Sequence, residues 1–256
     1  MDRPKMSFCT TNYNCAHILR KHLDSIYGQL SEEEFEYIVV DNLSKDESLE
    51  ILNDFAKRHR NMKVVSRKCS MGTGRQIAFS HSKGDYIVVV DTDTVYYPIM
   101  REFLDSYLNN YRDFAVQAIY CGIFPRGIWM QVDGRHDFNT GEDLEMWMRI
   151  WLLNKMKWCP VEMGENMKEE RAMDSYDHFS SRYGKMEKLK RFIRREYDIL
   201  RLRKYERYDL VSIWKSNQVD LGLGTLKDDW FGKRKAVSFF NWWAYAARTV
   251  VHILRE

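Results

Sequence analysis

The sequence predicts an α/β fold: a mostly parallel, mixed sheet flanked by helices, followed by a helical extension at the C-terminus. Two observations support this prediction. Apolar segments alternate with amphipathic ones through the first half of the chain, as expected when helices cover both faces of a parallel sheet. In the last third, a basic segment at 186–208 and an aromatic one at 236–254 each have helical periodicity.

The elements follow in order along the chain. Residues 6–11 predict a strand that ends in polar residues, and the next segment is a helix with one apolar face that ends before Gly28. Alternating strands and helices then continue as far as Asp91. The predicted strands are 37–40, 64–65, 86–90 and 116–120, and the predicted helices are 47–59, a short one after Gly72-Thr73-Gly74-Arg75, and 142–153.

Composition limits the classes of protein that the chain can be. With 256 residues, 45% of them hydrophobic and only four prolines, it can form one large domain or a domain with an appendage. We expect a sheet domain over residues 1–180 and the basic and aromatic extension over 181–256. The net charge of +3 is too small to indicate a nucleic-acid binder.

Cysteine usage and hydropathy suggest where the protein works. The five cysteines are scattered without a CxxC pair, so neither a disulfide framework nor a zinc site is expected. The N-terminus lacks the apolar core of a signal peptide, and no uncharged apolar stretch reaches the roughly 18 residues of a membrane span. We therefore expect a cytoplasmic protein, with the option of peripheral contact at the inner face of the cell membrane.

The strongest functional signal is Asp91-Thr92-Asp93, directly after the most apolar predicted strand. Ligands of open α/β sheets bind at the carboxyl ends of the strands. Two carboxylates separated by one residue at such an end can share a hard divalent cation with a diphosphate, whose developing charge the metal neutralises. A DxD pattern arises often by chance, though seldom at the end of a five-residue apolar strand, so a simple turn is the less favoured interpretation.

Other polar residues near predicted strand ends allow two interpretations each. Asp41 can accept a hydrogen bond from a nucleobase N–H, or it can cap a turn. Arg75 follows glycine-rich residues 72–74, interpreted as a turn whose mobility would bring the guanidinium onto a phosphate; an exposed arginine at a helix start is the alternative. Glu142 and Asp143 can stabilise a helix N-terminus, or a carboxylate there can act as a general base.

The order of these pieces resembles the family 2 glycosyltransferases of the GT-A fold, over about residues 6–160. Thr11-Asn12-Tyr13-Asn14 is similar to that family's Pro-Thr-Tyr-Asn turn, and Val39-Val40-Asp41-Asn42-Leu43-Ser44 to its Val-Val-Asp-Asp-Gly-Ser. Gly74-Arg75-Gln76, Gly84-Asp85-Tyr86-Ile87, the DxD and Gly141-Glu142-Asp143 with Arg149 then follow in the family's order. Departures at Thr11, Asn42-Leu43 and Gln76 affect the expected base preference rather than the fold.

The resemblance implies a metal-dependent, inverting transfer of a hexose from a nucleoside-diphosphate sugar to an acceptor hydroxyl or a lipid phosphate. It implies Mn²⁺ or Mg²⁺ at Asp91 and Asp93. Asp143, beside Glu142, is the implied base. His178 is a candidate third metal or diphosphate contact, or an ordinary structural histidine. Nucleotide contacts are assigned by position to Thr11, Tyr13, Asn14, Asp41, Arg75, Asp91 and Thr92.

The C-terminal segments suggest a partner surface. Lysine and arginine attract anionic lipid headgroups and tryptophan favours the membrane interface, so residues 186–208 and 236–254 together indicate a peripheral membrane contact. The equal alternative is a solvated basic helix, with the aromatic helix packed on the sheet or against another subunit of a homo-oligomer.

Two other functions compete with glycosyl transfer. A nucleotidyltransferase should have a glycine-rich loop after the first strand, and residues 10–14 contain no glycine. A non-catalytic nucleotide-binding protein should have lost acidic residues, whereas Asp41, Asp91, Asp93 and Asp143 are all present. We therefore expect a UDP- or GDP-linked donor and a glycan or lipid-linked acceptor.

Overall fold

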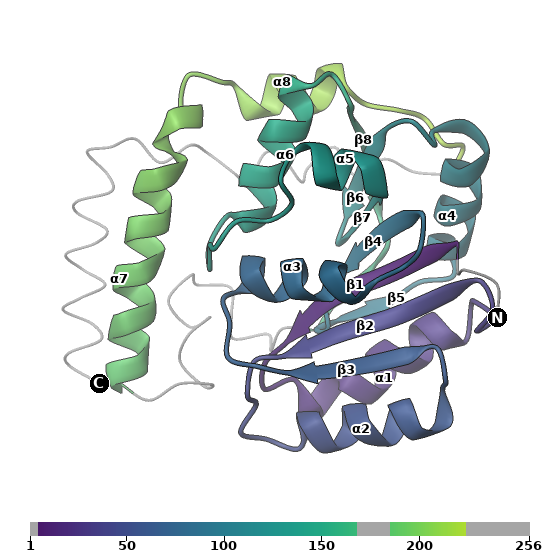
Figure 1. Cartoon of the computed structure of the whole chain (residues 1–256). Coiled ribbons are helices and arrows are strands. Elements are labelled where there is room, and N and C mark those ends of the chain that lie inside the picture. Colours follow the sequence, from purple (N-terminus) through teal and green to yellow (C-terminus); the bar gives the residue numbers. More distant parts are fainter. Residues whose placement is uncertain (1–4, 168–184, 224–256) are drawn as a thin grey trace.

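The computed structural model describes residues 5–167 and 185–223 and confirms the predicted α/β fold (Figure 1). Within these residues, seven strands form one sheet in the order β3-β2-β1-β4-β7-β6-β8. Neighbouring strands are parallel except at β7, which is antiparallel to β4 and β6. The strands are β1 (Met6–Asn12), β2 (Phe35–Asp41), β3 (Met62–Ser66), β4 (Tyr86–Val90), β6 (Ala115–Ile119), β7 (Cys121–Pro125) and β8 (Met156–Glu162).

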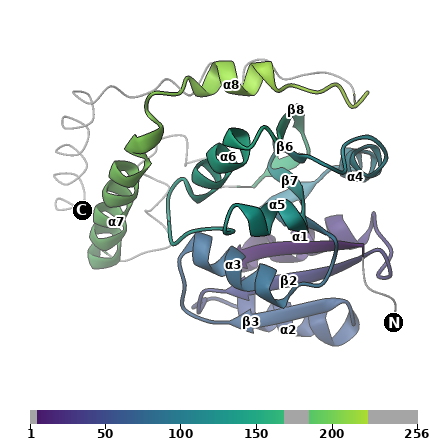
Figure 2. The ribbon, with the colours of Figure 1, turned by 45° about the horizontal axis from the view of Figure 1, so that its top comes forward.

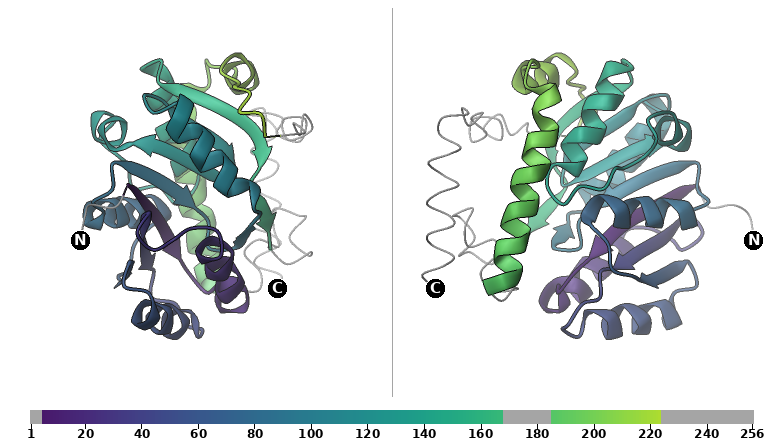
Figure 3. Two further views of the ribbon diagram at one scale, coloured as in Figure 1. Left: turned by 90° about the vertical axis from the view of Figure 1, so that its right-hand side faces the viewer. Right: turned by 60° about the vertical axis from the view of Figure 1, so that its left-hand side comes forward.

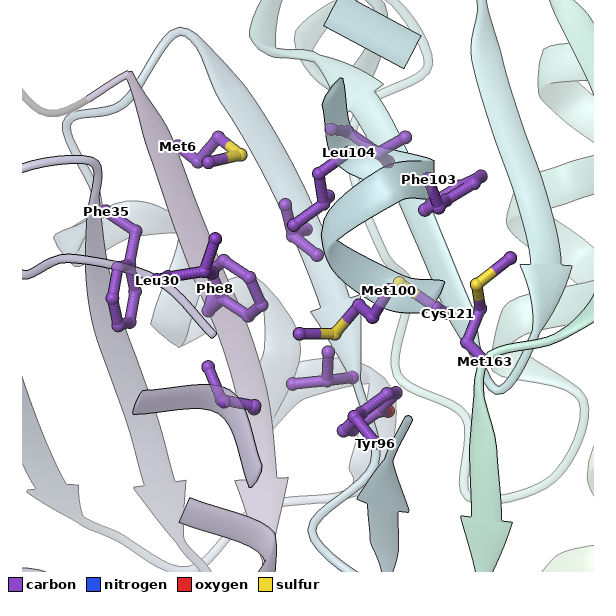
Figure 4. Packing of buried hydrophobic residues seen from close by; sticks show 14 of the residues in the cluster. Met6, Phe8, Leu30, Phe35, Tyr96, Met100, Phe103, Leu104, Cys121 and Met163 are labelled. Atoms are coloured by element: carbon purple, nitrogen blue, oxygen red, sulfur yellow. The ribbon is translucent and has the colours of Figure 1, made fainter. Parts of the chain in front are cut away.

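Helices cover both faces of this sheet, as the alternating sequence pattern predicted. One face carries α1 (Ala16–Tyr27), α2 (Ser48–Arg58) and α4 (Ile99–Asn110), and part of its core is shown in Figure 4. The other face carries α3 (Met71–His81), α5 (Arg126–Gln131) and α6 (Glu142–Leu152). Successive side chains of a strand point to opposite faces of the sheet. In β1, Phe8 therefore packs in the core on the α1, α2 and α4 face, and Cys9 packs in the core on the α3, α5 and α6 face.

Two short strands form a second sheet beside the end of β4. They are β5 (Thr94–Tyr96) and β9 (Gly164–Asn166), which pair antiparallel. This pairing follows directly after the DxD and fixes the chain there, since Thr94 lies opposite Asn166.

One local prediction is wrong: residues 72–74 are not a mobile turn. They form the first turn of α3, where the Ser70 hydroxyl accepts a hydrogen bond from Thr73 N at 3.1 Å. The glycines serve close packing instead, because a Cβ on Gly74 would overlap the Thr11 methyl and one on Gly72 would overlap the carbonyl of His136. Figure 2 shows α3 lying across β1 and β2, so Arg75 is carried by a packed helix.

The basic helix predicted at 186–208 is present as α7 (Lys185–Leu202) but ends six residues earlier than predicted. It is followed by a 3₁₀ helix, Arg203–Tyr205, and by α8 (Leu210–Ser216). The chain after α7 returns to the domain core, where the Trp214 ring meets that of Trp158 at 4.7 Å. Next to it, Trp158 N donates to Asn217 O at 2.9 Å and Val219 N donates to Trp158 O at 2.8 Å, so this segment pairs with the outer edge of β8.

No helix within residues 5–167 and 185–223 combines the length and hydropathy that a bilayer crossing requires. The predicted aromatic helix at 236–254 and His178 lie outside the described residues.

Candidate functional site

The carboxyl ends of β1, β2 and β4 bring the predicted polar clusters to one edge of the sheet. These strands are parallel neighbours, and Asn12 lies opposite Asp41 in the β1–β2 register. Thr92 Oγ1 donates to Thr11 O at 3.3 Å, which ties the DxD segment to the end of β1. Thr11, Asp41 and Thr92, each predicted from a different motif, therefore share this edge.

Asp41 is fully buried at this edge, with 0% of its surface exposed. Its Oδ1 accepts from Asn12 Nδ2 at 2.8 Å and from Ser44 Oγ at 2.6 Å, and its Oδ2 accepts from Ser44 N at 2.9 Å. The carboxylate thus holds the turn at 42–44 closed over the strand end. Because Asp41 is fully buried, a nucleobase N–H could reach its carboxylate only if the side chains that cover it moved.

Tyr13 and Asn14 form the neighbouring wall of the edge. The Asn14 side-chain oxygen accepts from Lys45 N at 2.8 Å and its backbone N donates to Ser44 Oγ at 2.9 Å, so Asn14 supports the turn. Tyr13 is half-buried, and its ring faces the guanidinium of Arg191 with 5.4 Å between the ring centre and Cζ.

Arg75 is buried and lies between two carboxylates. Its Nη1 donates to Glu142 Oε1 and its Nη2 donates to Asp91 Oδ1. Arg135, also buried, donates to the same Glu142 oxygen at 3.2 Å. Burial and the charge of Arg75 lower the pKa of Arg135, while Asp143 and Asp91 act in the opposite direction.

Glu142 and Asp143 differ sharply in their surroundings. Glu142 is 3% exposed and serves as counterion to two guanidinium groups, so an acceptor cannot approach it. Asp143 is half-buried, and its Oδ1 accepts from Leu144 N at 2.8 Å. Asp143 is therefore the more accessible of these two carboxylates.

Asp91 and Asp93 are oxygen ligands of the kind that Mg²⁺ and Mn²⁺ prefer. The Asp91 side chain is 40% exposed, and Asp93 Oδ1 accepts from Asn166 Nδ2 at 3.2 Å. Within residues 5–167 and 185–223, no group of three or more His, Cys, Asp or Glu side chains is arranged to hold a metal ion. One or two carboxylates with phosphate oxygens and waters are sufficient for Mg²⁺, so the residues fit a cation that arrives with a diphosphate.

Glu145, which belongs to none of the motifs, joins several side chains around the start of α6. It is fully buried, and it accepts from Arg149 Nη2 at 2.6 Å and from Tyr205 OH at 3.3 Å, with His136 Nδ1 3.2 Å away. Burial alone would raise the pKa of Glu145, but the bonds and charges of Arg149 and His136 hold it below its usual range. The four-residue spacing of Glu145 and Arg149 on α6 was the signal for this pair.

Comparison with known proteins extends the resemblance found in the motifs. The model of the glycosyl transferase family 2 matches residues 7–178. A poly(ribitol-phosphate) beta-glucosyltransferase of Bacillus spizizenii is 37% identical over 93 residues, covering 35% of this chain and 15% of that protein. Glycosyltransferase GlyA of Streptococcus pneumoniae is 26% identical over 200 residues, covering 77% of this chain and 26% of that protein. The chain thus spans a minor part of the length of these relatives.

Solved structures share the fold. TarS 1-349 of S. aureus in complex with UDP-GlcNAc has a TM-score of 0.56 at 17% identity, over 64% of this chain and 61% of that one. The mannosyltransferase PcManGT of Pyrobaculum calidifontis, in complex with GDP-Man and Mn²⁺, has a TM-score of 0.54 at 19% identity, over 72% and 66%. Because the family match runs from β1 to beyond β9 and so takes in both sheets, the chain belongs to glycosyl transferase family 2.

Proposed function

We propose that the protein transfers a hexose from a UDP- or GDP-linked donor to an acceptor hydroxyl, with a divalent cation and with inversion at the anomeric carbon. The observation that carries this proposal is the link from Asp91 through Arg75 to Glu142, the residue next to Asp143. It joins the carboxylates suited to a cation to the carboxylate suited to a base. Family membership supports the reaction class, and the ligands of TarS and PcManGT support the donor class.

Each residue has a distinct role in this proposal. Asp91 and Asp93 would hold the cation, which when bound supplies positive charge at the diphosphate leaving group. Asp143 accepts the proton of the acceptor hydroxyl, whose oxygen forms the new bond to the anomeric carbon. The bond from that carbon to the diphosphate oxygen breaks, and the nucleoside diphosphate leaves with the electron pair. Glu142 positions α6, so Asp143 keeps its place relative to the donor.

We also propose that the protein works beside a membrane, with residues 1–180 carrying the transfer site and 181–256 the contact. The solvent side of α7 carries large apolar side chains spaced seven, four and three residues apart, with Lys190 exposed beside them. They are Met186, Ile193, Tyr197 and Leu200, from 43% exposed at Leu200 to 68% at Met186. An apolar stripe bordered by lysine suits an anionic lipid surface, and a lipid-linked acceptor would then be within reach.

The membrane proposal is tested by sedimentation with phosphatidylglycerol vesicles. Ile193→Glu with Leu200→Glu should reduce the bound fraction several-fold while the thermal unfolding midpoint stays near that of the wild type. Wild-type protein that stays in the supernatant would contradict membrane contact.

A thermal-shift screen tests the proposed reaction class most directly. Ligands that bind only the folded state raise the unfolding midpoint by an amount set by their concentration and affinity. UDP or GDP should raise the midpoint with Mn²⁺ present and much less with excess chelator. The absence of a shift with every nucleoside diphosphate, in the presence of Mn²⁺, would contradict the proposal.

A further inference from the structure

We infer that α7 holds the loop that leads to the proposed base, and that Asp198 on this helix is a positioning residue for Asp143. The inference rests on the proposed function, in which Asp143 accepts the proton of the acceptor hydroxyl. Helix α7 begins beyond residues 7–178, which the family model matches, and Asp198 belongs to none of the motifs.

Residues 136–141 form the loop that leads into α6, and this loop lies between two helices. On one side, Gly72 N in the first turn of α3 donates to Phe138 O at 3.0 Å. Figures 1 and 3 show α7 on the other side of the loop. The direction in which the chain enters α6, and with it the place of Asp143 in the first turn, therefore depends on both helices.

Asp198 is the main polar link between α7 and this loop. It is fully buried, and its Oδ2 accepts a hydrogen bond from Asn139 N at 2.8 Å. Its Oδ1 lies 3.4 Å from Arg194 Nε and 3.5 Å from Arg201 Nη1. Both guanidinium groups also donate to Asp137 O, Arg194 Nη2 at 3.0 Å and Arg201 Nη1 at 2.8 Å. One buried carboxylate therefore orders a backbone N–H of the loop and the two arginines that hold the carbonyl beside it.

Two further contacts from the end of α7 and the 3₁₀ helix after it lie close to Asp143 in the chain. Leu202 packs on Gly141 so closely that a Cβ there would lie 2.5 Å from its Cδ1. The hydroxyl of Tyr205 donates to the buried Glu145 Oε1 at 3.3 Å. The contacts at residues 139, 141 and 145 thus flank Asp143 on both sides along the chain, so this part of the molecule fixes the backbone that carries it.

The contacts of Asp198 predict an effect on the transfer step and not on nucleotide binding. A general base acts only within hydrogen-bond reach of the proton that it takes, and a displacement of about 1 Å can lower the rate by on the order of 10². Among residues 5–167 and 185–223, the polar contacts of Asp198 are with Asn139, Arg194 and Arg201. None of these three lies at the carboxyl ends of β1, β2 and β4, where we propose that the donor binds.

Turnover and nucleotide affinity of full-chain Asp198 variants test the inference. Turnover is the release of nucleoside diphosphate from UDP-glucose, UDP-N-acetylglucosamine or GDP-mannose with Mn²⁺, with water as the acceptor, and calorimetry gives the affinity for UDP and GDP. Asp198→Ala should lower kcat by on the order of 10-fold, and Asp198→Asn, which keeps an oxygen for Asn139 N, should lower it less. Affinity for the nucleotide should stay within about twofold of the wild type in both variants.

Glu206→Ala is the matched control. Glu206 is exposed and its carboxylate is 3.4 Å from Arg203 Nε, so the variant also removes a carboxylate that is paired with an arginine. Its kcat should stay within about twofold of the wild type, as expected for an exposed ion pair. Hydrogen exchange gives a readout that does not need turnover, because the amides of residues 139–145 should exchange faster in Asp198→Ala and at the wild-type rate in the control.

The split between kcat and nucleotide affinity separates positioning from a merely structural role. A structural role alone would lower the thermal midpoint of Asp198→Ala and leave kcat per folded molecule unchanged, and that result would overturn the inference. Equal losses of kcat and nucleotide affinity would do so too, and Asp198→Asn decides if the alanine variant does not fold. If the wild type binds a nucleotide but releases none from these donors, unchanged exchange at residues 139–145 overturns the inference. A wild type that binds neither UDP nor GDP would instead refute the proposed function.

Discussion

The buried guanidinium of Arg75 is ion-paired with the buried carboxylate of Glu142, and this contact joins α3 to α6 across 67 residues of sequence. Arg75 also donates to Asp91, and Arg135 shares Glu142. The carboxylate of Glu142 therefore holds the Arg75 segment and the Glu142-Asp143 segment in a fixed arrangement, although they are distant in the chain.

Glu142→Gln should destabilise the fold by roughly 3 kcal/mol, because two buried guanidinium groups lose a shared counterion. The free energy of unfolding in urea measures this. Glu50→Gln is the matched control, since Glu50 is also in the first turn of a helix but is exposed, and its loss should cost only a few tenths of a kcal/mol. Equal stability of the Glu142 variant and the wild type would contradict the structural role.

Asp143→Asn should leave the fold intact and lower kcat by on the order of 10², because asparagine keeps the shape but cannot take a proton. Affinity for the donor nucleotide should be almost unchanged, since the proposed role of Asp143 concerns the acceptor. Steady-state kinetics with unfolding midpoints for both proteins provide the measurement. Near-normal turnover would show that the base is another residue.

Asp93→Asn should abolish the effect of Mn²⁺ on nucleotide binding. In the wild type, repulsion between the diphosphate and the Asp91 and Asp93 carboxylates should make affinity weak without a cation and much stronger with one. Titration of UDP and GDP with Mn²⁺ and with chelator measures the difference. Identical affinities for the wild type under both conditions would remove the metal from the proposed site.

Leu43→Gly should stabilise the protein by roughly 0.5 to 1 kcal/mol. Leu43 has φ 53° and its side chain is 49% exposed, so it holds a left-handed backbone conformation with little packing in return. The related family has glycine at this place in the turn. Leu43→Ala keeps the Cβ and should give no comparable gain in thermal midpoint, and a gain in both variants would show that backbone conformation is not the cause.

Stability should fall as the pH drops from about 6.5 towards 4, and His22 is one cause. Its Nδ1 donates to Thr94 O at 2.7 Å, so its Nε2 accepts from the Tyr37 hydroxyl at 2.6 Å. Burial lowers the pKa of His22 to about 4. The unfolded chain, with an ordinary histidine pKa near 6.5, binds more protons between these values, which costs up to about 3 kcal/mol at the acidic end.

Urea unfolding between pH 4 and 7 measures this dependence on pH. His22→Gln should have a shallower slope than the wild type over that interval, whereas His81→Gln, which changes an exposed histidine, should keep the wild-type slope. A slope that is the same in all three proteins would assign the acid sensitivity to other groups.

The fold was predictable where local patterns are strong. Of the four strands that precede the DxD, β2 contains the apolar run 37–40 and β4 is apolar throughout. The polar residues of the site edge lie at or just after the ends of β1, β2 and β4. Helix α4 could also have been predicted in this way, because its buried residues recur three and four positions apart. They are Met100, Phe103, Leu104, Tyr107 and Leu108. By contrast, β5 and β9 have three residues each and pair Thr94 with Asn166, so no local pattern marks them.

The candidate site was predictable in its residue types but not in their surroundings. The order of the motifs predicted Asp91, Arg75 and Asp143 as site residues. The buried ion pairs of Glu142 could not be predicted, because their guanidinium groups come from Arg75 and Arg135 in two other segments. The glycines at 72 and 74 indicated a turn because glycine usually permits unusual backbone angles, whereas here it permits close approach. Contact between Arg191 and Tyr13 spans most of the chain and has no signature in either segment.

The pairing of residues 217–219 with β8 has a consequence for colloidal behaviour. An unprotected outer strand presents free N–H and C=O groups that can recruit a strand from another molecule, and natural sheets cover or interrupt such borders. Here Asn217 and Val219 occupy the Trp158 backbone groups. A shortened version of the protein that ended before residue 217 would uncover them, so recombinant fragments intended for crystallisation should extend through Leu223 to avoid self-association.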